Sequence, residues 1–202
     1  MSPRVVVLDY GSGNLRSAER ALARVGADVE VTADLDAARE ADGLVVPGVG
    51  ALAACAAGVR DVGAGPVVRE RLADERPVLG ICVGMQLLFT SGDEHGEHTE
   101  GLDVLPGHVR RLRAQVLPHM GWDTVRPPAG SRLLDGLDDA WFYFVHSYAV
   151  VGDVDGAQVG TTEHGERFVA TVERGALSAT QFHPEKSADA GAHLLRNWVG
   201  SL

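Results

Sequence analysis

The amino-acid sequence predicts an α/β fold, a three-layer sandwich in which helices cover both faces of a mostly parallel central sheet. Roughly the first ninety residues alternate short apolar runs with segments of helical periodicity, which is typical of parallel strands joined by helices. The second half contains short β-rich runs separated by Gly and Pro, which predicts antiparallel or mixed additions to the sheet. The 202 residues contain no repeat and no long linker, so we expect one domain over 1–202.

The first half is expected to hold four strands and five helical segments. The clearest helix follows the first strand, because apolar residues recur on one face from Leu15 to Val25 and Gly26 stands where a terminating glycine belongs. The strands are expected at 5–8, 28–32, 43–47 and 77–81. The helices are expected at about 15–25, 36–41, 51–57, 67–75 and 85–89.

The second half is expected to be rich in strands and to end in a helix. That helix covers about 188–199 and turns Leu194, Leu195 and Trp198 inward. The strands are expected at 109–112, 122–125, 141–146, 156–162, 168–173 and 177–182.

Composition excludes several classes of function. The formal net charge of −10 and the absence of a basic block argue against nucleic acid or an anionic membrane as the main partner. No segment is long and apolar enough for a membrane span or a signal peptide. Two cysteines make no disulfide scaffold, so we expect a cytoplasmic protein, with Cys55 an inert core residue.

The segment Gly80-Ile81-Cys82-Val83-Gly84 has the pattern of a nucleophile elbow in which sulfur replaces the serine oxygen. An apolar strand precedes it and a helical run follows it. Glycines two residues to either side allow the strained turn that holds one side chain up at the end of a strand. Such glycines have no purpose in an ordinary strand, so we interpret Cys82 as a nucleophile.

His183 and Glu185 are the expected base and its orienting carboxylate. Pro184 disfavours the helical region for the residue before it, which predicts an extended His183. In an extended chain, side chains two apart project to the same face, so Glu185 can accept a hydrogen bond from the imidazole. A histidine and a helix N-terminus lower the pKa of a thiol from about 8.5 and favour the thiolate.

An oxyanion formed at Cys82 needs two hydrogen-bond donors. The backbone N–H of Val83, directly after the nucleophile, is the first. In elbow enzymes the second comes from the loop after an earlier strand, and Gly48-Val49-Gly50 is such a loop, with Val49 and Gly50 as candidate donors.

With these residues the chain resembles the class I triad glutamine amidotransferases, and most of all the glutaminase subunits of imidazole glycerol phosphate synthase. The matching segments reach from residue 9 to 187 and lie at 9–15, 47–50, 80–88, 118–122, 143–148 and 181–187. The resemblance implies a flavodoxin-like domain that needs no cofactor or metal. It further implies that Cys82 attacks the side-chain amide of L-glutamine, and that ammonia passes to a cyclase for histidine biosynthesis.

The resemblance also implies which residues hold glutamine. Glu94 is expected to meet the α-ammonium group, and Ser147 and Tyr148 the α-carboxylate through backbone amides. The implied substrate-binding set is Gly48, Gly50, Gln86, Glu94, His146, Ser147 and Tyr148. The Pro-Gly-Val-Gly segment is expected to rearrange before the oxyanion hole is complete.

The segment 93–100 allows two other interpretations. The first is a solvated acidic loop, in which Glu94 would have no special role. His95 and His98 among carboxylates could also form a metal site, but isolated loops of this kind usually face solvent, so we expect none.

The partner implied by the resemblance is a cyclase of (β/α)₈-barrel type, which would form a heterodimer with this chain. The candidate contact residues are Asn14, Arg20, Trp122, Tyr143 and Lys186. For Trp122 the alternative is core packing, and for Lys186 it is an exposed charge. Asp123 and Ala51 depart from the family pattern, which affects docking or loop packing and leaves the reaction untouched.

Three rival functions remain open from the sequence. One is the glutaminase subunit of another class I amidotransferase, although the segment His119-Met120-Gly121-Trp122 argues against it. The second is a stand-alone cysteine hydrolase of the γ-glutamyl hydrolase or DJ-1/PfpI type. The third is a retired fold that only binds, in which replacing Cys82 would change nothing.

Overall fold

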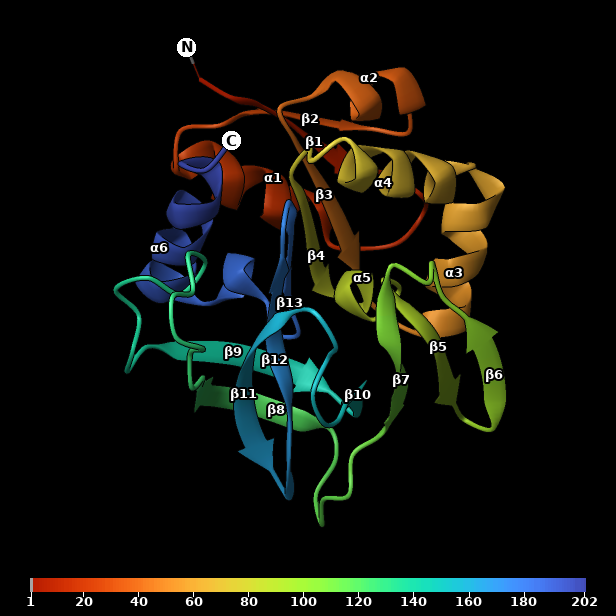
Figure 1. The fold of residues 1–202 in the computed structure, drawn as a ribbon, viewed down its shortest axis with the longest axis vertical. Helices are drawn as coiled ribbons and strands as arrows, with labels where there is room; N and C mark the ends of the chain where they lie inside the picture. The colour runs from red at the N-terminus through yellow and green to blue at the C-terminus, as the bar shows by residue number, and fades with distance from the viewer. Residues whose placement is uncertain (1) are drawn as a thin grey trace.

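The centre of the molecule is a seven-stranded sheet with the strand order β11-β12-β13-β4-β3-β1-β2 (Figure 1). The computed structural model describes residues 2–202. Five of the strands are parallel to one another: β1 (Arg4–Leu8), β2 (Asp28–Thr32), β3 (Gly43–Gly48), β4 (Val78–Cys82) and β13 (Leu177–Thr180). The antiparallel strands β12 (Glu166–Arg174) and β11 (Gln158–His164) extend one edge. The mostly parallel sheet with antiparallel additions confirms the predicted fold class.

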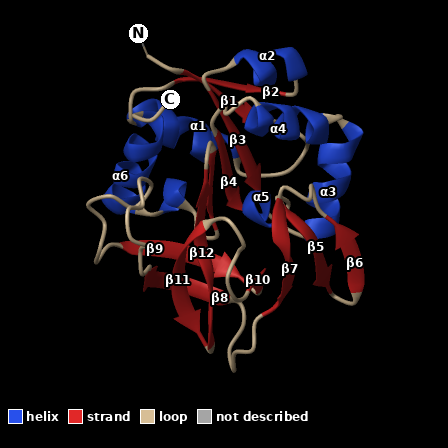
Figure 2. Cartoon of the chain, in the orientation of Figure 1, coloured by secondary structure: helices blue, strands red, loops and turns tan. Residues whose placement is uncertain are grey.

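Helices cover both faces of this sheet (Figure 2). On one side α1 (Leu15–Arg24) packs beside α6 (Ala188–Val199). On the other side lie α2 (Leu35–Glu40), α3 (Leu52–Asp61) and α4 (Ala64–Ala73). Because both faces are covered, all residues of β3 and β4 are buried, which explains why these strands read as continuous apolar runs. None of the helices within residues 2–202 is long and apolar enough to cross a membrane.

The second half differs from the prediction, because only its last three strands, β11, β12 and β13, join the main sheet. The other strands form two separate sheets (Figure 1). One has the order β10-β7-β5-β6 and contains β10 (Tyr148–Val150), β7 (Leu105–Arg111), β5 (Phe89–Glu94) and β6 (Glu97–Glu100). The other pairs β8 (His119–Thr124) with β9 (Trp141–His146). Which strands pair depends on contacts between distant segments, which strand periodicity does not report.

Two predictions for the segment after Cys82 are wrong, one in the length of a helix and one in the type of structure. The helix after Cys82 is the single turn α5 (Val83–Gln86), and the chain enters β5 at Phe89 instead of continuing as a helix. Leu87, Leu88 and Phe89 are all fully buried, so no polar face marks a helix there. The acidic segment 93–100 is a hairpin rather than a loop, with positive φ angles at His95 and Gly96 in its turn.

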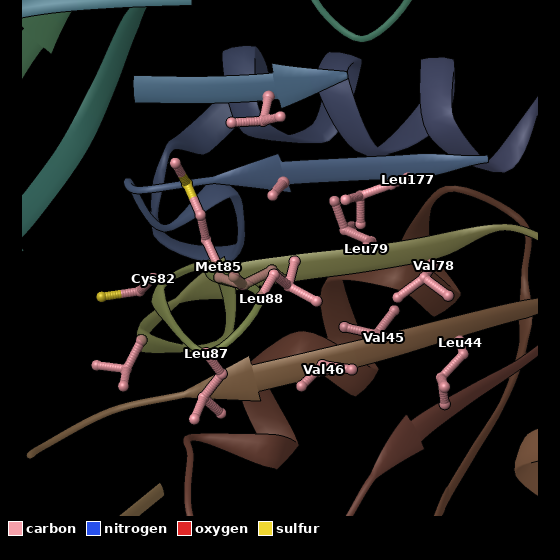
Figure 3. Packing of buried hydrophobic residues seen from close by; sticks show 14 of the residues in the cluster. Leu44, Val45, Val46, Val78, Leu79, Cys82, Met85, Leu87, Leu88 and Leu177 are labelled. Atoms are coloured by element: carbon pink, nitrogen blue, oxygen red, sulfur yellow. The ribbon is translucent and has the colours of Figure 1, made fainter. Parts of the chain in front are cut away.

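The core around β3 and β4 ends where the elbow begins. Leu79 is the register partner of Val45 on β3, and both belong to one buried cluster with Met85 and Leu88 of the segment that follows β4 (Figure 3). Cys82 lies at the carboxyl end of β4, and its sulfur points away from this cluster (Figure 3). The packed core therefore holds the strand and leaves its last side chain free for chemistry.

Candidate active site

Cys82 occupies a strained backbone conformation at the junction of β4 and α5. Its φ of 56° and ψ of −112° are rare for a residue with a side chain. The turn is held by close backbone packing, because a Cβ atom on Gly84 would collide with the carbonyl oxygen of Val46, and one on Gly48 with the backbone nitrogen of Gly84. Only glycine at these two positions lets α5 lie against β3.

The loop after β3 lies beside the elbow, as expected from the strand ends. Gly48 is the register partner of Cys82 in the parallel pair β3–β4, so both strands end at the same edge of the sheet. In α/β sheets this edge is where ligands bind.

His183 and Glu185 form a buried hydrogen-bonded pair. The His183 Nδ1 lies 2.7 Å from the Glu185 Oε1, and their side chains are only 2% and 4% exposed. With Nδ1–H donating to the carboxylate, Nε2 is left free to face the sulfur.

The pairing arises in a different way from the one expected. His183 is extended, with φ −100° and ψ 98°, but Pro184 then begins the short 3₁₀ helix η1 (Pro184–Lys186). Glu185 therefore reaches His183 from a helical turn and not from an extended strand. Proline is well suited to the first helical position, since its missing N–H needs no partner there.

The surroundings of His183 favour its charged form. Burial lowers the pKa of His183, but its contacts with Cys82 and Glu185 together outweigh that effect and raise the pKa to about 9. A protonated imidazole beside a sulfur stabilises the thiolate, which is the nucleophilic form of cysteine.

These residues line a cavity of about 240 Å³. Its walls come from the loop after β3, the elbow, β5, the segment from the end of β9 into β10, and η1. The lining residues are Val49, Gly50, Cys82, Val83, Gln86, Glu94, Val145, His146, Ser147, Tyr148, His183 and Lys186. Most of the sequence-predicted site residues are thus brought together, whereas Gly48 is not part of the lining and packs against Gly84.

Gln86, in the cavity lining, is held by two hydrogen-bond acceptors. Its Nε2 donates to the backbone oxygen of Tyr148 at 2.9 Å and to the Oε1 of Gln181 at 3.1 Å. The Nε2 of Gln181 in turn lies 3.8 Å from the Cys82 Sγ. Sequence reasoning did not select Gln181, although it lies two residues before His183 at the end of a strand, a spacing that places side chains on one face.

Glu94 has a structural contact that the sequence did not reveal. Its Oε2 accepts a hydrogen bond of 2.6 Å from the backbone N–H of Leu52, the first residue of α3. The carboxylate therefore caps a helix while it also lines the cavity. This position next to the loop after β3 excludes the interpretation of Glu94 as a freely solvated side chain.

His146 is a neutral histidine in the cavity wall. Burial lowers its pKa to about 3, against the opposing effect of its hydrogen bond with the backbone oxygen of Tyr148. That bond, from Nδ1 at 3.0 Å, fixes the Tyr148 carbonyl that also accepts from Gln86.

The five candidate contact residues lie in different surroundings. Trp122 is 49% exposed and packs edge-on against Tyr143, its partner across β8 and β9, so core packing is excluded. Asn14 is exposed at the start of α1. Arg20 borders a separate cavity that also touches Glu185, and Lys186 lines the Cys82 cavity itself.

Two other features have some of the properties of a functional site. His98 contacts Asp93 and Glu100 at the surface, but no cluster of His, Cys, Asp and Glu within residues 2–202 has the arrangement of a metal site. A larger cavity of about 400 Å³ is lined by residues such as Asp123, Arg126 and Glu163, and has no cysteine or histidine among its described lining residues. The smaller cavity at Cys82 is therefore the candidate active site.

Comparison with known proteins gives one consistent result. The sequence model of the family "Glutamine amidotransferase class-I" matches residues 6–201. The imidazole glycerol phosphate synthase subunit HisH of Streptomyces avermitilis is 61% identical over 208 residues, covering 98% of this chain and 97% of that protein. The same subunit of Nocardia farcinica is 62% identical over 206 residues and 98% of both chains.

Solved structures show the same fold at lower sequence identity. A crystal structure of a glutamine amidotransferase matches with a TM-score of 0.78 and 22% identity, over 98% of this chain and 99% of that one. The structure of PurLQS from Thermotoga maritima matches with a TM-score of 0.76 and 16% identity, over 100% and 99%.

Proposed function

Since the chain belongs to the class-I glutamine amidotransferases, and within them to the HisH group, we propose that it hydrolyses L-glutamine and passes ammonia to a cyclase subunit. The observation that carries the proposal is the shared cavity of Cys82 and His183, with His183 bonded to Glu185 at 2.7 Å. The rival function of a stand-alone hydrolase is not favoured, because relatives with about the same length and high identity are named as synthase subunits.

The reaction begins with the Cys82 thiolate and the His183 imidazolium. The sulfur attacks the side-chain amide carbon of glutamine and forms a tetrahedral oxyanion, which the N–H groups of Val83 and of Val49 or Gly50 stabilise. The C–N bond then breaks, and the imidazolium gives its proton to the departing nitrogen. The products of this half are ammonia and a Cys82 thioester.

Water completes the cycle. Neutral His183 accepts a proton from the water that attacks the thioester, and the C–S bond breaks to give glutamate and the thiolate. Glu185 holds the Nδ1–H of the imidazole throughout, so that Nε2 faces the reacting atoms. The pKa of about 9 supports this assignment, because the imidazolium is then the main form at neutral pH.

The other cavity residues are proposed to bind the amino-acid end of glutamine. Glu94 supplies a negative charge for the α-ammonium group, and backbone amides of Ser147 and Tyr148 receive the α-carboxylate. Gln86 and His146 hold the Tyr148 carbonyl in place. The backbone of Gly50 contacts the substrate, and Gly48 allows the loop to approach the elbow.

The cyclase is proposed to be a (β/α)₈ barrel that docks over the exposed apolar side chains of β8 and β9. Met120, Trp122 and Trp141 are 66%, 49% and 56% exposed there, a grouping typical of a protein contact. Asn14, Arg20, Tyr143 and Lys186 complete the proposed contact set. We place the heterodimer in the cytoplasm, where the free thiols of Cys55 and Cys82 remain reduced, and treat residues 1–202 as one domain.

The test uses the chain together with its cyclase and the Cys82→Ala variant. Glutamine-dependent synthesis should be lost, because no thioester can form, whereas synthesis from ammonium salts should continue at the wild-type rate. A variant that retains glutamine-dependent synthesis would exclude Cys82 as the nucleophile. A wild-type chain that hydrolyses glutamine at full rate without a cyclase would instead favour the stand-alone hydrolase.

A further inference from the structure

Side chains from outside the cavity hold two carbonyl groups, one near the end of β3 and one in the loop after it. The Ser12 hydroxyl donates a hydrogen bond of 3.0 Å to the Val49 oxygen. The Cys55 sulfur lies 3.4 Å from the same oxygen and 3.1 Å from the Ser12 hydroxyl. Two residues before Val49, the backbone oxygen of Pro47 accepts a hydrogen bond from the Tyr10 hydroxyl.

Each group of this cluster has a hydrogen-bond role that its chemistry allows. Ser12 has one proton, which goes to the Val49 oxygen, so Cys55 donates its own proton to Ser12 or to Val49. Burial raises the pKa of Tyr10 far above its usual value, so its hydroxyl remains a donor. Cys55 is fully buried on α3 and Tyr10 is 4% exposed, so water does not compete strongly for the hydrogen bonds that these two side chains make.

The contacts matter because little else holds this peptide. Gly50 has a φ of +85°, and no atom lies within 4 Å of the place where its Cβ would be. The Val49 side chain is 36% exposed and is not anchored in the core. Rotation of the Val49–Gly50 peptide would therefore meet little steric resistance without the hydrogen bonds to its oxygen.

We infer that Ser12 and Cys55 are positioning residues for glutamine hydrolysis, which hold the Val49 carbonyl away from the cavity and thereby turn the Gly50 N–H toward Cys82. In a trans peptide the C=O and the following N–H point in opposite directions. Val49 and Gly50 line the cavity with Cys82, whereas Ser12 and Cys55 lie outside its lining. This inference rests on the proposed function and adds to it two side chains that never touch the substrate.

The expected effect is on the transition state more than on substrate binding. A donor aimed at the oxyanion gains strength as charge develops, and loss of a whole donor costs about 10²–10³ in rate. A donor that is present but less well held should cost about 10- to 100-fold in kcat, with the KM for glutamine changed by no more than about twofold.

The experiment compares Ser12→Ala, Cys55→Val and the double variant, each in complex with the cyclase. Cys55→Val removes the donor at similar volume, and Cys55→Ser and Ser12→Thr keep a donor as matched controls. We expect kcat for glutamine to fall in the first set and to stay near wild type in the controls. The decrease of kcat in the double variant should be smaller than the product of the two single decreases, because both side chains act on the same Val49 oxygen.

A second measurement separates positioning from general damage. The rate of Cys82 alkylation by iodoacetamide should be unchanged in all variants, since the sulfur and His183 are untouched. Wild-type kcat in Ser12→Ala and Cys55→Val, or an equal loss in Cys55→Ser, would overturn the inference. If Cys55→Val fails to fold, Ser12→Ala at its partly exposed loop position decides alone. A wild-type complex without glutaminase activity would instead overturn the proposed function.

Discussion

The backbone oxygen of Tyr143 accepts a hydrogen bond of 3.0 Å from the backbone N–H of His183. The N–H of Tyr143 donates at 2.9 Å to the Ser187 hydroxyl, which itself donates to the His183 oxygen at 2.6 Å. Tyr143 also packs on the exposed Trp122. The segment that holds the imidazole is thus bonded directly to the strand pair that we propose as the docking face.

Replacing Trp122 by Ala should weaken cyclase binding by about 30-fold or more, because exposed aromatic side chains at the centre of a contact carry much of its energy. The free energy of unfolding of the isolated chain should change by less than about 0.5 kcal/mol, as expected for a surface position. Titration calorimetry with the cyclase measures the first and urea unfolding the second. Val116→Ala, an exposed apolar change outside β8 and β9, is the control. Wild-type affinity of Trp122→Ala would exclude this docking face.

Replacing Glu185 by Gln should lower the pKa of His183 from its value of about 9. The carboxylate no longer favours the imidazolium, so the alkaline limb of the kcat/KM profile should move to lower pH and kcat should fall by about 10²–10⁴. Carbon NMR of the His183 ring reports the pKa directly. An unchanged pKa would mean that Glu185 does not set the charge of the imidazole.

The same raised pKa of His183 has a consequence for stability. Its imidazole binds a proton more tightly in the folded protein, so its stabilising contribution is complete below about pH 6.5, the ordinary value. That contribution should be lost as the pH rises through about 9.

Replacing Glu94 by Gln should separate its two contacts. The amide oxygen can still accept from the N–H of Leu52, so the free energy of unfolding should change by at most about 0.5 kcal/mol. Loss of the charge should raise the KM for glutamine by about 10- to 100-fold, as expected for a hydrogen bond to a charged group. Glu94→Ala should raise KM in the same way and also destabilise the chain by about 1 kcal/mol. Equal KM values for wild type and Glu94→Gln would contradict the proposed α-ammonium contact.

Replacing His146 by Gln should make the protein less sensitive to acid. The pKa of His146 is lowered to about 3, so between about pH 6.5 and 3 the unfolded chain binds a proton that the folded chain does not. Stability should therefore fall with decreasing pH by about 1.4 kcal/mol per pH unit for this residue. Urea unfolding at a series of pH values measures this slope. In the variant the slope should be smaller by about 1.4 kcal/mol per pH unit, which corresponds to one proton. The pKa of His119 is also lowered by burial, so part of the slope will remain.

Sequence reasoning was most accurate where the structure depends on near neighbours. The order of strands and helices through β4 follows from periodicity, and the bounds of β2 and α6 agree with the prediction. The elbow follows from the spacing of Gly80, Cys82 and Gly84, because steric limits on a turn act over a few residues. The His183–Glu185 pair was also expected, although the local backbone that makes it is a 3₁₀ turn.

The sequence by itself determined that a cysteine stands at a strained strand end and that a histidine and a carboxylate lie two residues apart. Only the tertiary structure decided what surrounds them. Glu94 meets the N–H of Leu52 across 42 residues, and Ser12 meets Val49 across 37. Trp122 is exposed because β8 and β9 form a sheet of their own. Such contacts depend on how the elements pack, and packing energies between distant segments leave no regular spacing in the chain.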